Sequence, residues 1–278
     1  MTSAPDRYAV IGHPIEHSRS PWIHARFAQQ TGERMVYSAI DAAPQDLAER
    51  VRDFFQSGGC GLNVTVPHKQ AVLPLLQELS DRARIAGAVN LILRAADGRL
   101  RGDNTDGSGL VRDLTYNLGV PIAAQRLLLL GAGGAARGII GPLLALHPAE
   151  LVIANRSAAR AIDLAQQFTR YGAVRGAAYA ELGRQRFALI INATSAGLSS
   201  EIPPLPVEVL DAATVCYDLA YTRDTTRFVQ WARERGVSRS IPGAGMLVEQ
   251  AAESFLLWRG IRPDTTAVLA DLLALQAQ

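Results

Sequence analysis

The sequence predicts an α/β protein of two domains. Its 278 residues, 48% hydrophobic and 19% charged, are enough to build two globular cores. Strand-like apolar runs alternate with helix-like segments along most of the chain, which is typical of α/β folds. One run, Leu127–Leu130, consists of four leucines and leads into a glycine-rich turn. A strand of that composition is covered on both faces, as in a parallel sheet.

Composition and charge argue against several classes of protein. The net charge is +2 and no run of lysine or arginine occurs, so we expect no nucleic-acid partner. No apolar stretch reaches the ~18 residues that span a bilayer, and Met1–Asp6 lacks the parts of a signal peptide. We therefore expect a cytoplasmic protein with no membrane partner and with Cys60 and Cys216 as free thiols. The histidines lack metal-binding spacings, so no metal is expected.

The first part of the chain predicts a strand–helix–strand unit. Strands are expected at 8–12, 36–40 and 62–66, and a helix at 44–55. Ser20 before Pro21 is the pattern of a helix N-cap followed by proline at the first helical position. Ser18 has no such role. The two hydroxyls are therefore interpreted either as a pair that meets a polar ligand or, for Ser20, as a cap alone.

Lys69 follows the third strand in the run Pro67-His68-Lys69. Pro67 favours a helix start, which places Lys69 in a first helical turn, where a cation opposes the helix dipole. Two interpretations are open. Lys69 is an exposed lysine that loses little by this position, or it is placed for chemistry at the carboxyl end of a strand, where α/β folds carry their sites.

A helix at 80–86, a strand at 88–94 and a hairpin turn at Asp97-Gly98 follow. The return strand begins at Leu100 and runs into a polar segment that includes Asp106, by its position an ordinary helix N-cap. Leucines at helical spacing come next, and we place the domain boundary on that helix. One domain is expected at 1–106, completed by 243–278, and the other at 107–242.

The leucine strand leads into a turn whose spacing matches a dinucleotide-binding motif. Gly131, Gly133 and Ala136 follow the G-x-G-x-x-G/A pattern, although any tight strand-to-helix turn can produce it. Gly131 permits the tight turn, and Gly133 lets backbone N–H groups approach a pyrophosphate at the start of the next helix. Nucleotide contacts are expected from Gly131, Ala132, Gly133, Gly134 and Ala135.

The next strand, 151–154, ends at a segment that carries Asn155, Arg156, Ser157 and Arg160. An NAD-preferring site has an acidic residue here for the ribose 2′-hydroxyl, and this segment has none. Arg156 and Arg160 are four residues apart, which predicts one helix face at the positive end of the dipole, where both charges are unfavourable. A bound 2′-phosphate turns both costs into attraction, so the segment favours NADP over NAD. The alternative is two solvated arginines.

The rest of the chain continues the alternation. A buried strand that ends in a polar loop is expected over 189–197 and a strand at 215–219. Helices are expected at 228–235, from 246 onward and at 265–275, and a flexible turn at 241–245. Ser195 lacks the glycine two residues before it that a nucleophile elbow requires, so a hydrolase is rejected. Gln250 stands among apolar residues of the long helix. Considered by itself, it is interpreted as a surface amide.

Eight short motifs run along nearly the whole chain: Ser18-Arg19-Ser20-Pro21, Asn63-Val64-Thr65-Val66-Pro67-His68-Lys69, Gly87-Ala88-Val89-Asn90, Gly102-Asp103-Asn104-Thr105-Asp106-Gly107, Gly131-Ala132-Gly133-Gly134-Ala135, Asn155-Arg156-Ser157, Asn192-Ala193-Thr194-Ser195, and Gly243-Ala244-Gly245-Met246-Leu247 with Gln250. Together they resemble the shikimate dehydrogenase family. One such match would be weak, but eight in the family's order and spacing are specific.

The resemblance implies an N-terminal α/β substrate domain completed by C-terminal helices, and a doubly wound NADP-binding Rossmann domain. It implies reversible hydride transfer between NADPH and 3-dehydroshikimate, giving shikimate, in the chorismate pathway to aromatic amino acids. It also implies that Lys69 and Asp106 are the catalytic pair. The family's shikimate-binding residues match Ser18, Ser20, Thr65, Asn90, Asp106, Tyr221 and Gln250. Those on the nicotinamide side match Asp81, Leu219 and Gly243.

Three positions depart from the family pattern. Leu91 stands where threonine is frequent, His68 where an aromatic residue is common, and Pro242 where an acid is usual. Two alternatives are kept: a quinate/shikimate dehydrogenase with relaxed substrate and cofactor use, and a non-catalytic NADP-binding sensor on the same scaffold. Lys69 and Asp106 together favour an enzyme. The sequence leaves open a monomer or a homodimer, and which of the two residues dominates proton transfer.

Overall fold

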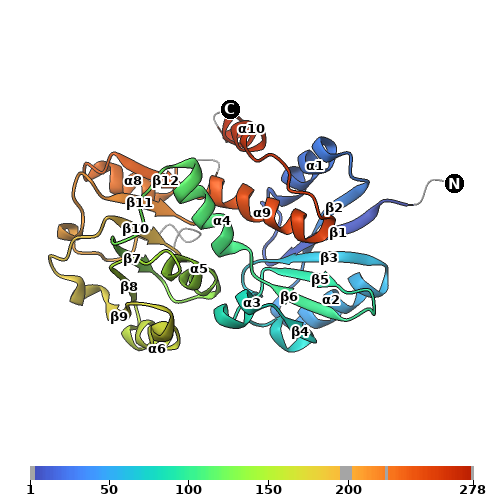
Figure 1. Ribbon diagram of the computed structural model, residues 1–278, viewed down its shortest axis with the longest axis horizontal. Helices are drawn as coiled ribbons and strands as arrows, with labels where there is room; N and C mark the ends of the chain where they lie inside the picture. The colour runs from blue at the N-terminus through green and yellow to red at the C-terminus, as the bar shows by residue number, and fades with distance from the viewer. Residues whose placement is uncertain (1–3, 195–201, 223–224, 277–278) are drawn as a thin grey trace. The chain divides into compact units, whose positions relative to one another are not determined.

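The apolar runs of the sequence form two six-stranded sheets, which belong to two compact units (Figure 1). They are seen in a computed structural model that describes residues 4–194, 202–222 and 225–276. Unit 1 contains the residues up to Gly109 together with Val248–Asp271. Unit 2 contains Leu110–Leu247 and the residues from Leu272 onward. The chain thus changes unit after 109, after 247 and again after 271, whereas the boundaries expected from the sequence are after 106 and after 242.

Unit 1 is built on a mixed sheet with the strand order β2-β1-β3-β5-β6-β4. Strand β1 is parallel to β2 and β3, and β5 runs antiparallel to both β3 and β6. The carboxyl ends of β1, β3 and β6 and the start of β5 therefore lie at the same end of the sheet. The elements of the first segment are β1 (Asp6–Gly12), α1 (Ser20–Thr31), β2 (Met35–Asp41), α2 (Leu47–Gln56), β3 (Gly59–Val64), β4 (Glu78–Leu79), α3 (Asp81–Ala86), β5 (Leu91–Arg94), β6 (Leu100–Asp103) and α4 (Asp106–Arg112).

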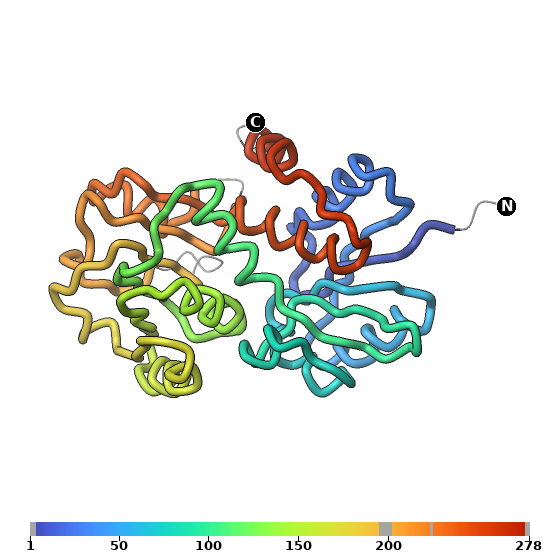
Figure 2. The backbone as a smooth tube through the Cα atoms, in the orientation of Figure 1, coloured from blue at the N-terminus to red at the C-terminus, as the bar shows by residue number. Residues whose placement is uncertain are grey.

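The core of unit 1 lies between this sheet and the helices packed on it. One apolar cluster joins Phe54 and Phe55 of α2 to Ile11 and Leu62 of the central strands. The returning chain adds α9 (Ala244–Arg259) and α10 (Thr266–Gln276), drawn in red in Figure 2. The indole of Trp258 on α9 donates a hydrogen bond to the carbonyl of Ile92, 3.2 Å away. The last turns of α9 are thereby fixed on the sheet.

Unit 2 is a fully parallel sheet with the order β12-β11-β10-β7-β8-β9. Leu127, Leu128, Leu129 and Leu130 are all buried, which confirms a strand covered on both faces. The order reverses between β7 and β10, the switch point at which doubly wound sheets bind ligands. Its remaining elements are β7 (Arg126–Leu130), α5 (Gly134–Leu144), β8 (Glu150–Asn155), α6 (Ala158–Phe168), β9 (Val174–Ala178), β10 (Leu189–Asn192), β11 (Val215–Asp218), α8 (Arg227–Glu234) and β12 (Arg239–Pro242).

Two predicted elements are wrong. The turn expected at 241–245 is instead the end of β12 followed by the start of α9. Strand β12 is short and at the sheet edge, where proline is tolerated, so its Ile241-Pro242-Gly243 sequence imitates a turn. The helix expected from Pro67 is a series of turns that ends in the 3₁₀ segment Leu73–Leu75.

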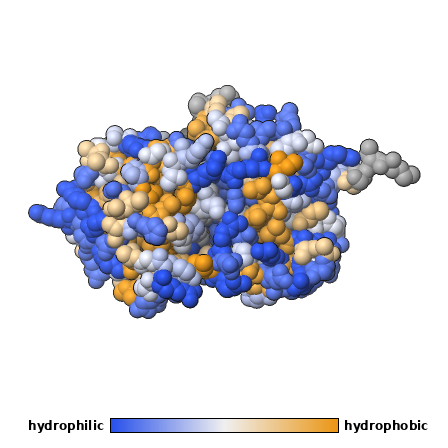
Figure 3. Space-filling view, in the orientation of Figure 1, coloured by the Kyte–Doolittle hydropathy of each residue, from blue (hydrophilic) through white to orange (hydrophobic). Residues whose placement is uncertain are grey.

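Polar and charged residues cover much of the face in Figure 3, with smaller hydrophobic patches between them. No helix within the described ranges is long and apolar enough to cross a membrane.

Candidate active site

The strongest candidate site lies in unit 1, at the end of the sheet where β3 and β6 finish and β5 begins. Lys69 follows β3, and Asp106 is the first residue of α4, after β6. The Lys69 ammonium nitrogen lies 2.6 Å from Asp106 Oδ2. Only 12% of the lysine side chain and 5% of the aspartate side chain are exposed. Partial exclusion of water strengthens the attraction between the two charges.

The turn that carries Lys69 is held at three points. The buried His68 ring bonds through Nε2 to the carbonyl of Ala42 at 2.7 Å, and the nitrogen donates because a carbonyl only accepts. The carbonyl of Lys69 accepts from the amide of Val89 at 2.7 Å, and the carbonyl of His68 accepts from Val72 at 3.0 Å. Because no helix begins at Pro67, no helix dipole opposes the lysine charge.

Asn90 connects the pair to the rest of the site. Its side-chain nitrogen donates to Asp106 Oδ1 at 2.8 Å and to Thr105 Oγ1 at 2.9 Å, and it lies 3.4 Å from Gln250 Oε1. Its side-chain oxygen accepts the Thr105 amide at 2.8 Å. Both Asp106 oxygens therefore have a donor, Nζ of Lys69 and the Asn90 amide. Gln250 belongs to this cluster and is not a surface amide.

The three predicted hydroxyls come from neighbouring parts of unit 1. Ser18 and Ser20 lie after β1, and Thr65 follows the adjacent parallel strand β3. The Thr65 amide donates to the carbonyl of Ile11 at 2.9 Å. Ser20 is not the cap: it is the first residue of α1, and its amide donates to Ser18 Oγ at 3.3 Å. The N-cap of α1 is Arg19, whose side chain makes no capping hydrogen bond, so the expectation that Ser20 caps the helix is wrong.

A second set of polar residues lies beside the site, and none of them was predicted individually from the sequence. Asp103 is buried and accepts from Ser80 Oγ, the Arg82 guanidinium and the Asn104 amide. Burial alone would raise the pKa of Asp103, but these hydrogen bonds and the Arg82 charge outweigh it and lower that pKa. The Asn104 side chain in turn accepts from the Asp106 amide at 3.1 Å. Only the Gly102–Gly107 motif pointed to this segment.

Unit 2 carries the predicted glycine turn between β7 and α5. Gly131 has φ of +105°, a conformation that side chains disfavour, and a β-carbon there would lie 3.0 Å from the carbonyl oxygen of Ala193. Gly133 is the N-cap of α5, and within the described ranges a β-carbon there would meet no atom within 4 Å. Helix α5 begins at Gly134, and Ala135 lies in its first turn. The turn thus leaves room for a group to approach the N-terminus of α5.

The two arginines do not share a helix face, contrary to the prediction. Arg156 precedes Ser157, the N-cap of α6, and Arg160 lies in the first turn of that helix. Both side chains are exposed. Asn155 fixes the bend by donating to the carbonyl of Ser157 at 3.1 Å. A third cation is nearby: burial and the charge of Arg160 together lower the pKa of Arg137 on α5.

The remaining predicted residues fall in three places. Leu219 and Gly243 follow the adjacent strands β11 and β12, and the Gly243 amide donates to the carbonyl of Ala220 at 3.1 Å. Tyr221 is half-buried in the segment after β11. Asp81 is in unit 1, at the start of α3, where it is exposed and paired with Arg84. Ser195 lies outside the described residues.

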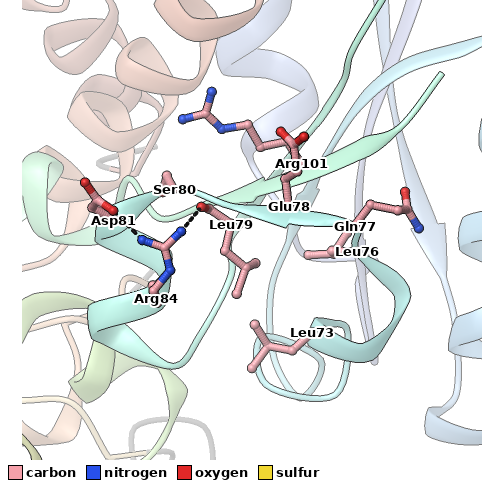
Figure 4. A pocket seen from close by; sticks show the side chains of 9 residues that line it. All are labelled: Leu73, Leu76, Gln77, Glu78, Leu79, Ser80, Asp81, Arg84 and Arg101. Carbon is pink, nitrogen blue, oxygen red and sulfur yellow. Dashed lines mark hydrogen bonds and ion pairs between the residues drawn. The ribbon is translucent and has the colours of Figure 1, made fainter. Parts of the chain in front are cut away.

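A pocket of about 620 Å³ lies beside the edge strand β4 in unit 1 (Figure 4). Asp81 is the one predicted site residue among those that line it, and neither Lys69 nor Asp106 does. Arg84 reaches across to Asp81 and to the carbonyl of Leu79, as the dashed lines show. The pocket is therefore separate from the charge pair.

Comparison with known proteins identifies families that match most of the chain. Residues 10–92 match a model described as the shikimate dehydrogenase substrate binding domain. Residues 115–230 match a model described as shikimate / quinate 5-dehydrogenase, and residues 243–273 match one described as the shikimate 5′-dehydrogenase C-terminal domain.

Individual relatives are similar over almost their full length. A protein named shikimate dehydrogenase (NADP(+)) from Methylococcus capsulatus is 54% identical over 97% of both chains, and one from Hahella chejuensis is 52% identical over 96% of this chain and 98% of its own. A crystal structure of shikimate 5-dehydrogenase from Thermus thermophilus, in complex with NADP(H) and shikimate, has a TM-score of 0.85 at 33% identity. It is matched over 97% of this chain and 99% of its own.

Proposed function

The chain belongs to the shikimate dehydrogenase family, and we propose that Lys69 and Asp106 form its catalytic pair. The protein catalyses the NADP-dependent, reversible reduction of 3-dehydroshikimate to shikimate. The observation that supports the assignment is the Lys69 ammonium 2.6 Å from Asp106, whose other carboxylate oxygen accepts a hydrogen bond from the side-chain amide of Asn90.

Unit 1 is proposed as the substrate domain. The substrate is a ring acid with several hydroxyl groups, and such a molecule needs many fixed donors and acceptors. Hydroxyls from Ser18, Ser20 and Thr65 and amides from Asn90 and Gln250 supply them at one end of the sheet of unit 1. We assign a further hydroxyl contact to Tyr221, which belongs to unit 2.

The proposed chemistry of Lys69 follows from its charge. Reduction of a ketone builds negative charge on the carbonyl oxygen, and an adjacent ammonium stabilises that charge and donates the proton. In the oxidative direction the neutral amine accepts the proton from the hydroxyl. Asp106 keeps the amine oriented through Oδ2 and is fixed by Asn90 through Oδ1. The same carboxylate is proposed to accept a hydrogen bond from a substrate hydroxyl.

Unit 2 is proposed as the NADP domain, and its residues fit that group. The space at Gly133 and the N-terminus of α5 suit a pyrophosphate, together with Ala132 and the turn at Gly131. Arg156 and Arg160, with Asn155 and Ser157, are proposed to bind the 2′-phosphate. Leu219, Gly243 and Asp81 are proposed to line the nicotinamide. When bound, NADPH supplies the hydride.

A cytoplasmic location is proposed as well. Both cysteines are free, and Cys216 is buried on β11. Burial raises the pKa of the Cys216 thiol to about 12, so it is an inert core residue. Free thiols of this kind are typical of proteins in a reducing compartment.

The test is a substitution of the lysine. Lys69→Ala is expected to lower kcat for shikimate oxidation by about a thousandfold or more, because it removes the proton acceptor and leaves the Asp106 carboxylate without an adjacent positive charge. NADPH binding, measured by fluorescence titration, is expected to stay within about twofold of the wild type. The control is Gln70→Ala, an exposed neighbour in the same turn. Turnover near the wild-type rate in Lys69→Ala would refute the assignment.

A further inference from the structure

Ser254 lies at the centre of a buried hydrogen-bond network that reaches the charge pair. It is on α9, one helical turn after Gln250, and its side chain is fully buried. Its hydroxyl oxygen is 3.0 Å from the side-chain nitrogen of Asn63, 3.2 Å from Thr105 Oγ1 and 3.0 Å from the carbonyl of Gln250. Strand β3, the segment after β6 and helix α9 therefore meet at one hydroxyl.

The number of hydrogens in this network fixes the direction of each bond. Asn63 donates its amide hydrogens to Ser254 and to the carbonyl of Asn90, at 3.0 and 3.1 Å. The Ser254 hydroxyl has one hydrogen, and the carbonyl of Gln250 takes it. Both Ser254 lone pairs are then free to accept, one from Asn63 and one from Thr105.

Thr105 connects Ser254 to Asn90 by hydrogen bonds to both. With its hydrogen directed at Ser254, the Thr105 oxygen accepts one amide hydrogen of Asn90 at 2.9 Å. The other amide hydrogen of Asn90 then has one strong acceptor, Asp106 Oδ1 at 2.8 Å. Asn63 is itself held from the other side, since its oxygen accepts the Tyr37 hydroxyl at 2.7 Å. Every donor along this path has an acceptor.

We propose that Ser254 is a positioning residue for the reaction, which acts through Thr105 and Asn90 to hold Asp106, and with it Lys69, in the productive orientation. This inference rests on the proposed function of the charge pair. Ser254 is fully buried and each of its contacts here is with protein, so it bonds to no substrate itself, and we expect its loss to lower kcat more than it raises KM.

The primary variant is Ser254→Ala. Without the serine oxygen, the Thr105 hydroxyl turns to the Asn90 side-chain oxygen, 3.3 Å away, and Asn90 no longer has a fixed acceptor for one hydrogen. We expect kcat to fall about tenfold, with the KM values for shikimate and NADP changed less than about twofold. Ser254→Thr, which keeps the hydroxyl, is expected to recover most of the rate.

Two controls separate positioning from general loss of structure. Thr31→Val removes a hydroxyl that bonds to a carbonyl four residues earlier on α1, as Ser254 does on α9, and should leave kcat unchanged. Thr105→Val, made alone and with Ser254→Ala, completes a double-mutant cycle. If Ser254 acts through Thr105, the double variant is no slower than the worse single variant. Circular dichroism melts verify that each variant is folded.

The outcomes distinguish this proposal from the proposed function. An active wild type with an inactive Lys69→Ala, together with a wild-type kcat in Ser254→Ala, would overturn the role of Ser254 alone. Rate losses that multiply in the double variant would also overturn it, because the two residues would then act independently. The proposal is supported by a lowered kcat in Ser254→Ala, recovery of the rate in Ser254→Thr, and a double variant that is no slower than the worse single variant.

Discussion

Lys69 and Asp106 hold opposite charges in a part of unit 1 that water reaches poorly. Taking such a pair out of water costs several kcal/mol per ion unless both groups keep their hydrogen bonds. The structure meets this condition for Asp106 with Lys69 on one oxygen and Asn90 on the other. The asparagine is therefore as much a part of the site as the two charged residues.

The exposed arginines of unit 2 give a prediction about cofactor choice. Arg160→Ala is expected to raise the KM for NADP about tenfold or more and to leave the KM for NAD within about twofold, since one charge-assisted bond to the 2′-phosphate is lost. Steady-state kinetics with both cofactors measures this. Arg184→Ala is the control. Arg184 is also exposed, but it precedes β10 and therefore lies at the amino end of that strand, away from the carboxyl end. Equal changes with NADP and NAD would contradict the assignment.

Side-chain chemistry was easier to predict than side-chain partners. The residue types and motifs around Lys69, Asn90 and Asp106 indicate their chemistry without coordinates. Ser254 could not be found this way, because a serine inside an apolar helix resembles any small core residue. Its meaning comes from Asn63 and Thr105, which are 191 and 149 residues away in the chain.

Helix α6 lies unusually close to the edge strand β9. A β-carbon on Gly176 of β9 would overlap the backbone of Ala161 and Ile162 on α6. Glycine in a strand commonly marks such a close approach. The contact also sets the position of the first turn of α6, which carries Arg160.

Substitution of Gly176 therefore affects both stability and cofactor binding. Gly176→Ala is expected to lower the free energy of unfolding by about 3 kcal/mol, because a backbone contact cannot move aside as a side chain can. The KM for NADP is expected to rise more than the KM for shikimate. Urea unfolding and kinetics measure the two effects. In the control, Gly172→Ala, the new β-carbon meets only the flexible side chain of Leu144, 3.2 Å away, and should cost less than about 1 kcal/mol. Similar losses in both variants would contradict this.

Elements with a strong repeating pattern were predicted well, and short irregular ones were not. The leucine run of β7 and the helix after it follow directly from the sequence. Strand β12 was mistaken for a turn because an edge strand of four residues can contain proline and be followed by glycine. The turn after β3 was mistaken for a helix because its contacts, from His68 to Ala42 and from Lys69 to Val89, are not local.

On the scale of the whole molecule, unit 1 depends on both ends of the chain. Arg259, at the end of α9, forms ion pairs with Asp6 and Glu33 and bonds to the Tyr8 hydroxyl. Gln30 bonds to both the amide and the carbonyl of Asp264. Val248–Asp271, which contains most of α9 and the first half of α10, is therefore a structural part of unit 1.

The fully buried His24 predicts how stability depends on pH. Burial among aromatic rings lowers the pKa of His24 from 6.5 to about 3, so the folded state holds it neutral. The unfolded chain binds a proton first as pH falls below 6.5. The contribution of His24 to the free energy of unfolding is thus fully present above pH 6.5, and the free energy of unfolding falls by roughly 1.4 kcal/mol per pH unit between pH 6.5 and pH 3.

Urea unfolding at pH 7 and pH 5 tests this effect. The wild type is expected to lose about 2 kcal/mol between the two pH values, and His24→Phe should lose much less, since phenylalanine fills the space without titrating. His17→Gln, at an exposed position, is expected to behave as the wild type. The same loss in His24→Phe as in the wild type would assign the effect to other groups.

The return of the chain through α9 also has a consequence for biosynthesis. Lys69 and Asp106 emerge early from the ribosome, whereas Ser254 and Arg259 on α9 emerge only after all the strands of unit 2. Nascent domains fold as units, in the order in which they emerge. Unit 1 has all six of its strands, β1 to β6, before the first strand of unit 2 emerges, but the hydrogen bonds that Ser254 and Arg259 supply can form only after α9 has followed β12.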